Sequence, residues 1–426
     1  MICDNLRYLR HLRSYNDGER FGGLRVKPAM TVCLCYLRSI LCFLFCSFSV
    51  QAQMISKRNM TLEVRWFQGD LKKHDAHLRS VLQKGTVSVY DFRIGFVDAD
   101  SSCFSVGSRH PVFGVGFAVV DYSRARMIDE PRSLGNIYSL YGYIDRTLFQ
   151  FKSIGLGYDL ESGVAYNTDP YDSVRSPNKI MSSSAFMIYV GLGLKLKYRL
   201  SDHWEIGVSA GAKHYSNGKY GIWNKGMNNL GGDVSLRYYF SPPVKNRPRM
   251  ASPFDRYFYW HLFAGGGLQT YLEDLILDNF KARNKKYPVY GKYFISGDAM
   301  VRLSRRYGCG LGLDFFYVPS LGSFKKLDEY LHGKEVAAGI RYEHFSAGIA
   351  INQELYYKHL AITASLGYYL YRELGLRENE NSLYQRFGYR YYFPRFHNLF
   401  VGYSIKAHYF HDAEYFEFSI GKTGKF

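Results

Sequence analysis

The sequence predicts an all-β protein, an antiparallel transmembrane β-barrel of the outer membrane, and three observations lead to this expectation. Tyr (39), Gly (41) and Phe (31) are abundant among 426 residues, while the mean hydropathy is slightly negative at -0.24. A membrane barrel needs this mixture, because aromatic girdles face lipid and polar side chains face inward. Beyond residue 53 no run approaches the roughly 18 apolar residues of a membrane helix. The chain instead contains strand-length segments in which apolar and polar residues alternate.

Residues 1–52 have the pattern of an export signal and are excluded from the fold. The apolar run from Met30 to Val50 is followed by small residues before a cleavage site after Ala52, as in a Sec signal peptide. The segment ahead of Met30 is rich in Arg, so we expect Met30 to be the true start. A retained helical anchor is the alternative, but the run is short for one.

Charge and cysteine content narrow the partners of an exported protein. The formal net charge is +18, which suits an anionic partner, and in an outer membrane that anion is lipopolysaccharide. Nucleic acid is a poor alternative after a signal peptide, whereas Lys and Arg that merely flank the bilayer would explain much of the excess. Only Cys103 and Cys309 follow the signal segment. We therefore expect neither a disulfide framework nor a cysteine metal site.

The clearest strand runs from Ile188 to Leu200. Its even positions are apolar, while Lys195, Lys197 and Arg199 follow two glycines on the odd positions. On a lipid face each cation would cost about 2 to 4 kcal/mol near the midplane. The three cations therefore face inward, into a lumen that is hydrated or charge-paired.

The first half of the chain, residues 53–240, contains eight strand candidates, the smallest common number for a closed barrel. In chain order they lie near 60–68, 86–98, 111–122, 135–148, 150–166, 184–200, 203–216 and 229–240. Residues 241–254 follow with three prolines in the stretch 241–249, and proline cannot continue a strand ladder. This segment is expected to be a linker or a periplasmic turn.

The second half, residues 255–426, repeats the strand pattern and ends at Phe426, which resembles the terminal aromatic signal of outer-membrane barrels. Arg-Tyr-Tyr-Phe occurs at 237–240 and again at 390–393, which indicates a duplication. Eight or nine strands are expected, near 255–271, 288–304, 306–318, 334–343, 345–355, 358–372, 384–393, 397–410 and 413–422. Two eight-stranded barrels in tandem and one barrel of about sixteen strands both fit this count.

Two polar residues at the end of the seventh strand, His214 and Ser216, have the outward phase. From Trp204 every even position is apolar, and extending this phase reaches His214 and then Ser216. Polar residues are rare on a lipid face and indicate a functional site there. With both chain ends periplasmic, this strand end lies at the extracellular rim. In the eighth strand the outward phase extends back to Asn228, which is expected to face the same patch.

These residues resemble the PagL-type lipid A 3-O-deacylases (acyloxyacyl hydrolase family), eight-stranded outer-membrane barrels with a His/Ser/Glu esterase site on the outside. The resemblance rests on Ala-Lys-His-Tyr-Ser-Asn at 212–217, on Asn-Lys-Gly-Met-Asn at 224–228, and on a closing strand that ends in an aromatic residue. It covers residues 60–240 loosely and 212–240 well. The second half would then be a C-terminal extension or a degenerate second copy of a divergent member.

The resemblance implies a role for each matching position. Ser216 would be the nucleophile and His214 its general base, with Asn217 as an oxyanion donor. Asn224 and Gly226 are further positions for substrate binding or the oxyanion. The substrate would be lipid A, which would lose an ester-linked 3-hydroxyacyl chain, and the reaction requires no cofactor or metal.

One departure from the family concerns the acid that orients the histidine, because Asn228 occupies its position. Asp233 is the only acid between His214 and Phe240, and its phase points it inward. In the Ser-His-Asp template, replacing the acid by its amide costs about 10⁴ in turnover. The chain is therefore a weak or divergent deacylase, or takes an acid from a loop such as 169–172, or keeps the fold without catalysis.

The remaining histidines show no convincing metal-ligand spacing. His74 and His77 lie three apart, but only Asp75 accompanies them, so this pair is a weak metal candidate. His408 stands in a stretch similar to the motif, but Phe410 replaces the serine. His408 shares the inward face with Lys406 and is interpreted as structural.

The sequence is compatible with three functions. The first is a lipid A ester hydrolase, and the second is a catalytically silent barrel that binds lipopolysaccharide or stabilises the membrane. The third is a channel, which a single wide barrel would favour, because about sixteen strands can leave an aqueous lumen whereas eight are filled by side chains.

Overall fold

The structure is a computed structural model that describes residues 59–100, 102–128, 134–172, 175–242, 253–271, 288–319, 321–375, 382–410 and 412–426. The expected signal segment, residues 1–52, lies outside the described residues, as do residues 243–252 of the expected linker. Within the described residues no helix is long and apolar enough to cross a membrane.

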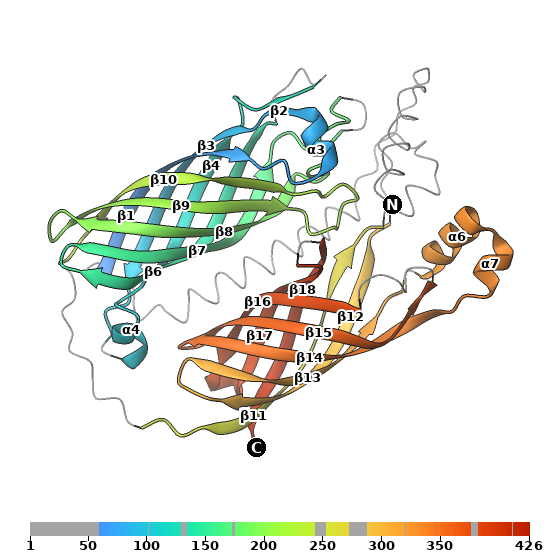
Figure 1. Cartoon of the computed structure of the whole chain (residues 1–426). Coiled ribbons are helices and arrows are strands. Elements are labelled where there is room, and N and C mark those ends of the chain that lie inside the picture. The colour runs from blue at the N-terminus through green and yellow to red at the C-terminus, as the bar shows by residue number, and fades with distance from the viewer. Residues whose placement is uncertain are drawn as a thin grey trace. The chain divides into compact units, whose positions relative to one another are not determined.

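Eight antiparallel strands of the first half form a closed barrel (Figure 1). Closure pairs the first strand with the last, because β1 bonds to β3 on one side and to β10 on the other. The strands are β1 (Met60–Leu71), β3 (Thr86–Val97), β4 (Val112–Asp121), β6 (Asn136–Phe151), β7 (Ile154–Asn167), β8 (Phe186–Arg199), β9 (Trp204–Ser216) and β10 (Met227–Tyr239). All eight expected strands are present.

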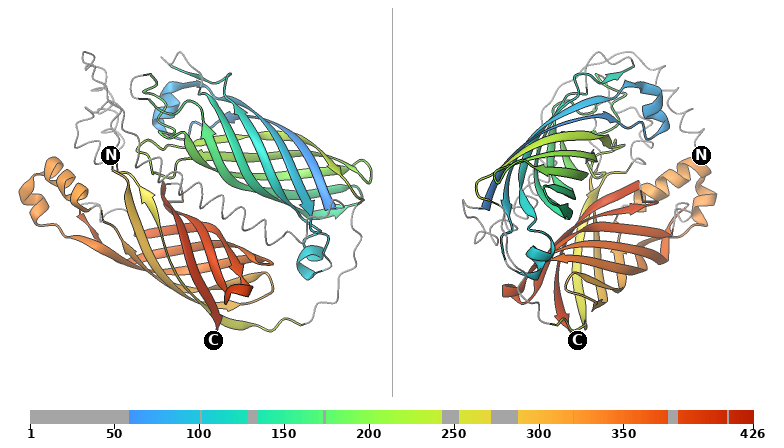
Figure 2. Two further views of the ribbon diagram at one scale, coloured as in Figure 1. Left: turned by 180° about the vertical axis from the view of Figure 1, so that it is seen from behind. Right: turned by 60° about the vertical axis from the view of Figure 1, so that its left-hand side comes forward.

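The second half forms a closed barrel of its own, in which β11 pairs with β18 (Figure 2). Two eight-stranded barrels therefore follow one another along the chain, and the alternative of one wide barrel is wrong. The strands are β11 (Tyr257–Gln269), β12 (Tyr290–Arg302), β13 (Tyr307–Tyr317), β14 (Tyr342–Tyr357), β15 (Leu360–Leu374), β16 (Leu383–Phe393), β17 (Leu399–His408) and β18 (Asp412–Lys425).

One predicted strand, 334–343, is wrong. This segment contains the helix α7 (Lys334–Ala338), which follows the helix α6 (Leu321–His332). Lys, Glu and Ala in α7 are good helix formers, and the stretch is too short to establish an alternating pattern. The remaining small elements were not predicted: α3 (Ala76–Val81), β2 (Leu82–Lys84), β5 (Arg126–Met127), α4 (Cys103–Gly107) and η5 (Pro394–Phe396).

The two faces of the first barrel differ as the sequence predicts. Along β8, Leu192 and Leu194 are 54% and 62% exposed on the outside, whereas Lys195 is fully buried inside. Lys195 forms ion pairs with Glu63 and Asp145. Charge pairs therefore fill this lumen, as an eight-stranded barrel requires. The other buried ionic groups along it are Arg65, Asp91, Arg93, Asp159, Glu161, Lys197, Glu205, Lys213, Asp233 and Arg237.

Each barrel has one end with longer connections. In the first barrel, residues 72–85, 122–135, 168–185 and 217–226 connect strands at the end where β9 stops, and residues 152–153 and 200–203 form tight turns at the other end. The connection 98–111, which contains α4, is the exception at the tight-turn end. We call the end that carries residues 217–226 the loop end.

Candidate functional site

His214 and Ser216 lie on the outer face of β9, close to the loop end. Their inward-pointing neighbours define this phase. Lys213 Nζ lies 2.9 Å from a carboxylate oxygen of Glu161 in the lumen, and the Tyr215 ring stacks on Tyr189 with 4.8 Å between centroids. Because successive side chains of a strand point to opposite faces, His214 and Ser216 point outward.

Asn228 is the direct partner of His214 across the strand pair. The register of β9 and β10 places the two residues opposite each other, and His214 Nδ1 lies 2.5 Å from Asn228 Oδ1. An amide oxygen can only accept, so Nδ1 carries the proton and donates it. The ring nitrogen Nε2 is then the unprotonated one, which is the form that a general base requires.

The Ser216 hydroxyl makes no hydrogen bond to the described part of the protein. Among the described residues, Ser216 Oγ has no hydrogen-bond partner. His214 and Ser216 lie two residues apart on one face of a strand, where side chains are neighbours. Hydrogen bonds of a catalytic pair often form only when substrate is bound, so this arrangement is compatible with a nucleophile and its base.

The loop 217–226 is organised by the two asparagines that the sequence singled out. The backbone N–H of Asn217 donates to Asn224 Oδ1 at 2.8 Å. Asn217 Nδ2 donates to the carbonyl of Trp223 at 3.1 Å and to Ser183 Oγ at 3.3 Å. The side-chain N–H groups of Asn217 therefore donate to neighbouring loop atoms. Asn224 accepts through Oδ1, and this hydrogen bond does not use its Nδ2 group.

Gly226 supports the ring of His214. Its φ of +74° is a conformation that favours glycine, and its N–H donates to the carbonyl of Met181 at 2.9 Å. A Cβ atom at this position would lie 2.9 Å from His214 Cε1. The glycine therefore allows the loop to contact the imidazole closely.

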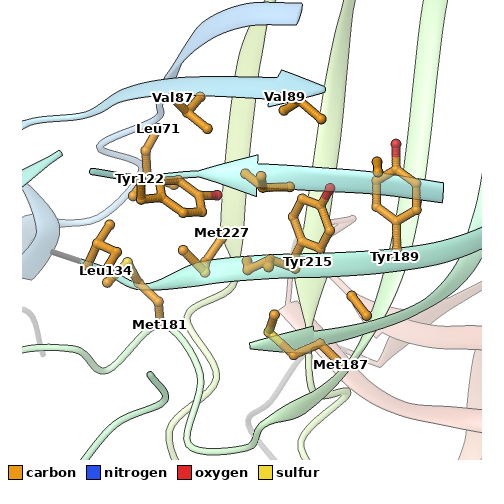
Figure 3. Packing of buried hydrophobic residues seen from close by; sticks show 14 of the residues in the cluster. Leu71, Val87, Val89, Tyr122, Leu134, Met181, Met187, Tyr189, Tyr215 and Met227 are labelled. Atoms are coloured by element: carbon orange, nitrogen blue, oxygen red, sulfur yellow. The ribbon is translucent and has the colours of Figure 1, made fainter. Parts of the chain in front are cut away.

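A packed apolar cluster lies behind the site, inside the barrel (Figure 3). Tyr215 projects inward between His214 and Ser216, and Met227 projects inward beside Asn228, and both are buried. They join residues from other strands and loops: Leu71, Val87, Val89, Tyr122, Leu134, Met181, Met187 and Tyr189. Such packing fixes the strand ends that carry the site.

Among the residues that the structure describes, no acid forms a hydrogen bond or ion pair with His214. Asp169 pairs with Lys179, and Asp172 pairs with Arg175. The loop 169–172, which the sequence suggested as a source of the missing acid, therefore does not supply an acid to His214. Asp233 lies in the lumen, as predicted, where it pairs with Arg65. Asn228 is the one hydrogen-bond partner of the His214 side chain among the described residues.

Sequence reasoning missed the contribution of His74, which lies between β1 and α3. His74 Nε2 lies 2.7 Å from the carbonyl oxygen of Lys225, and His74 Nδ1 lies 3.4 Å from Asn228 Nδ2. Only the closure of the barrel brings these residues together, since 154 positions separate His74 from Asn228. No local pattern signals such a contact.

His74 and His77, the pair that the sequence offered only as a weak metal candidate, contact different partners. His77 Nε2 lies 3.3 Å from the carbonyl of Asn178, whereas His74 contacts Lys225 and Asn228. Throughout the described ranges no group of three or more His, Cys, Asp or Glu side chains could hold a metal ion.

Asp75 anchors the segment that carries His74. Its carboxylate accepts from Leu78 N at 2.7 Å, which caps α3, and lies 3.5 Å from Lys225 Nζ. Burial raises the pKa of Asp75, but the Leu78 hydrogen bond and the charge of Lys225 outweigh it, so this pKa is lowered from its ordinary value. Asp75 thus stays ionised and ties α3 to the start of β10.

His408 of the second barrel points inward, as predicted. Its Nε2 lies 3.0 Å from Glu414, which also pairs with Lys406 at 2.8 Å, and its Nδ1 lies 3.0 Å from the carbonyl of Leu383. Phe410 is 79% exposed and offers no nucleophile. These buried contacts agree with a structural role.

Comparisons with known proteins relate both halves to one group. A family model described as lipid A 3-O-deacylase (PagL) matches residues 132–237, and one described as acyloxyacyl hydrolase, C-terminal domain, matches residues 258–424. No curated protein matches the chain.

The solved structures that the chain resembles are only weakly similar to it. A mutant porin from Rh. blastica is 9% identical, with 86% of this chain and 99% of the porin covered and a TM-score of 0.18. The Pseudomonas putida toluene transporter TodX is 10% identical, with 86% and 87% covered and a TM-score of 0.15. Similarities this slight carry no argument.

Proposed function

We propose that this chain, a divergent member of the PagL family of lipid A deacylases, removes an ester-linked 3-hydroxyacyl chain from lipid A by serine catalysis. The family models matched over residues 132–237 and 258–424 support a lipid A hydrolase of the outer membrane, and the serine mechanism and the choice of acyl chain go beyond them. One observation carries the proposal: the 2.5 Å contact between His214 and Asn228 leaves Nε2 as a base on the face that holds Ser216.

The proposed reaction follows the esterase pattern. Ser216 Oγ attacks the ester carbonyl while His214 Nε2 takes its proton. The bond between the acyl carbon and the sugar oxygen then breaks, and His214 returns the proton to that oxygen. Water, activated by the same imidazole, hydrolyses the acyl-serine and releases a 3-hydroxy fatty acid. Each step uses only side chains and water, so no cofactor is needed.

Asn224 is the best-placed donor for the oxyanion. Its Oδ1 accepts from Asn217 N, and this hydrogen bond does not use its Nδ2 group. The Nδ2 group of Asn217 and the N–H of Gly226 already donate to other loop atoms. In the proposal, Asn217 and Gly226 therefore shape the loop, and Asn224 Nδ2 stabilises the negative charge of the tetrahedral intermediate.

The surroundings suit a lipid with an anionic headgroup. Val190 and Leu230, on the strands β8 and β10, expose apolar side chains on the same outer face. Lys72, Lys73 and Lys225 are exposed at the loop end. Outer-membrane barrels place their long connections outside the cell, which puts the site in the outer leaflet, where lipid A lies. Export through a Sec signal in residues 1–52 is part of this proposal.

A catalytically silent barrel that binds lipopolysaccharide is the second candidate, and Asn228 favours it. An amide carries no charge, so it cannot stabilise the imidazolium that forms as Ser216 loses its proton. Both candidates bind lipopolysaccharide in the outer membrane. They differ in whether the ester is cleaved.

Purified protein in detergent, incubated with lipopolysaccharide, distinguishes the two candidates. We expect release of a 3-hydroxy fatty acid, detected by gas chromatography and mass spectrometry. Ser216→Ala and His214→Ala should each reduce the rate by about 10³-fold or more, as in other serine hydrolases. Ser153→Ala, in the exposed turn at the opposite end, is the matched control and should keep the activity. Full activity of Ser216→Ala would contradict the proposal.

A further inference from the structure

Asn228 differs from a carboxylate in having two unlike ends. Its Oδ1 accepts a hydrogen bond and its Nδ2 donates, whereas both oxygens of a carboxylate accept. The orientation of this amide therefore decides which nitrogen of His214 carries the proton. With Oδ1 toward the ring, at the observed 2.5 Å, the proton lies on Nδ1 and Nε2 is the base.

A flipped amide would disable the site. Nδ2 would then donate to His214 Nδ1, the ring proton would move to Nε2, and His214 could no longer accept the proton of Ser216. In the Ser-His-Asp template, the amide in place of the acid costs about 10⁴ in turnover because it selects the wrong tautomer. An enzyme with Asn228 therefore needs a group that holds its amide in one orientation.

His74 has the geometry for that task. Its Nε2 lies 2.7 Å from the carbonyl oxygen of Lys225, and a carbonyl only accepts, so Nε2 carries the ring proton. His74 Nδ1 of the neutral ring is then an acceptor, and it lies 3.4 Å from Asn228 Nδ2. The carbonyl of Lys72 lies 3.1 Å from Nδ1 and would accept a proton from it only in the other tautomer, in which the shorter 2.7 Å hydrogen bond from Nε2 to Lys225 is lost.

Backbone contacts keep His74 at this position. Lys72 N donates to the carbonyl of Asn228 at 2.7 Å, directly beside the site. Closure of the barrel places Leu71, the last residue of β1, opposite Asn229. Asp75 then links the following helix to Lys225. His74 is thus held against Asn228 from both sides of its own segment.

We infer that His74 is a positioning residue that holds the Asn228 amide with Oδ1 toward His214, and so selects the catalytic tautomer. This inference rests on the proposed function of Ser216 and His214. The contact replaces part of what the missing acid does, because it fixes the orientation of His214 although it supplies no charge.

The inference predicts a specific dependence between two positions. In an Asn228→Glu variant both carboxylate oxygens accept, so no flip can reverse the bond to His214 and His74 loses its task. His74→Phe should therefore lower kcat about tenfold with KM unchanged in the natural chain, the weight of one hydrogen bond, and should have no effect beside Asn228→Glu. Equal losses in both backgrounds would overturn the inference.

Conservative variants separate positioning from folding. His74→Asn keeps an amide oxygen near the position of Nδ1 and should restore part of the kcat that His74→Phe loses. His77→Phe, on the adjacent helix and bonded to Asn178 instead, is the matched control and should keep full activity. A loss in His77→Phe as large as that in His74→Phe would count against a specific role.

A measurement without turnover tests His74 independently of the proposed function. Long-range ¹H–¹⁵N spectra of the protein in micelles report the tautomer of His214. We expect the Nδ1–H form in the natural chain and a shift to the Nε2–H form in His74→Phe. An unchanged tautomer would overturn the inference, even if the Ser216-dependent activity is found. If the tautomer shifts in His74→Phe but no Ser216-dependent activity is found, the proposed function is contradicted and the effect of His74 on the His214 tautomer still stands.

Discussion

Gly226 illustrates how one residue sets the geometry of the site. The loop 217–226 must turn and approach His214 from one side, and this requires a positive φ and no side chain. The sequence suggested Gly226 only by resemblance, as a position for substrate binding or for the oxyanion. Its close approach to the imidazole could not be predicted, because it depends on the register between β9 and β10.

Gly226→Ala should therefore reduce deacylation by at least about tenfold, because the new Cβ meets His214 Cε1 and the backbone conformation costs about 1 to 3 kcal/mol. The rate of fatty acid release by purified protein checks this. Gly322→Ala is the control, since a Cβ there would have nothing within 4 Å. A Gly226→Ala enzyme as active as the natural one would show that His214 does not need this contact.

At the scale of elements, the strands were predictable and the contacts between distant strands were not. Alternation identified the eight strands of the first barrel and the inward cations of β8, because each strand has one lipid face and one lumen face. The partners of those cations come from other strands: Lys195 pairs with Glu63 of β1 and with Asp145 of β6. The contact of His74 with Asn228 was not predicted for the same reason, because only barrel closure brings β1 next to β10.

The lumen network gives a prediction about stability. Arg237 of β10 lies 2.8 Å from Glu63 and also pairs with Asp145, and all three side chains are almost fully buried. Arg237→Met should lower the free energy of unfolding by about 3 to 5 kcal/mol, because it leaves buried carboxylates with less compensating charge. Urea titration in micelles measures this. Arg79→Met, exposed on α3, is the control and should change it little. Equal stability of both variants would contradict the account of the lumen.

At the scale of the whole molecule, two closed barrels of eight strands replace the single wide barrel that the sequence also allowed. The strand count could not decide this, because only the pairing of β1 with β10 and of β11 with β18 closes each half. The second lumen is filled in the same way as the first. Arg386 pairs with Asp314 and Glu417, and Arg390 pairs with Glu354.

Filled lumens predict that the protein does not conduct. Protein reconstituted into planar bilayers should give no open-channel steps, because ion-paired side chains occupy the interior of each eight-stranded barrel. A porin reconstituted under the same conditions provides the positive control. Regular conductance steps that depend on this protein would contradict the conclusion that side chains fill each barrel, and would support a channel function.

The central claim is that Ser216 and His214 cleave an ester of lipid A on the outside of the first barrel. Mass spectrometry of lipid A from cells that express the chain tests it most directly. We expect lipid A to lose the mass of one ester-linked 3-hydroxyacyl chain, and this loss to disappear in Ser216→Ala and in His214→Ala, with each variant folded in the outer membrane. Identical lipid A with and without the folded natural protein would contradict the claim.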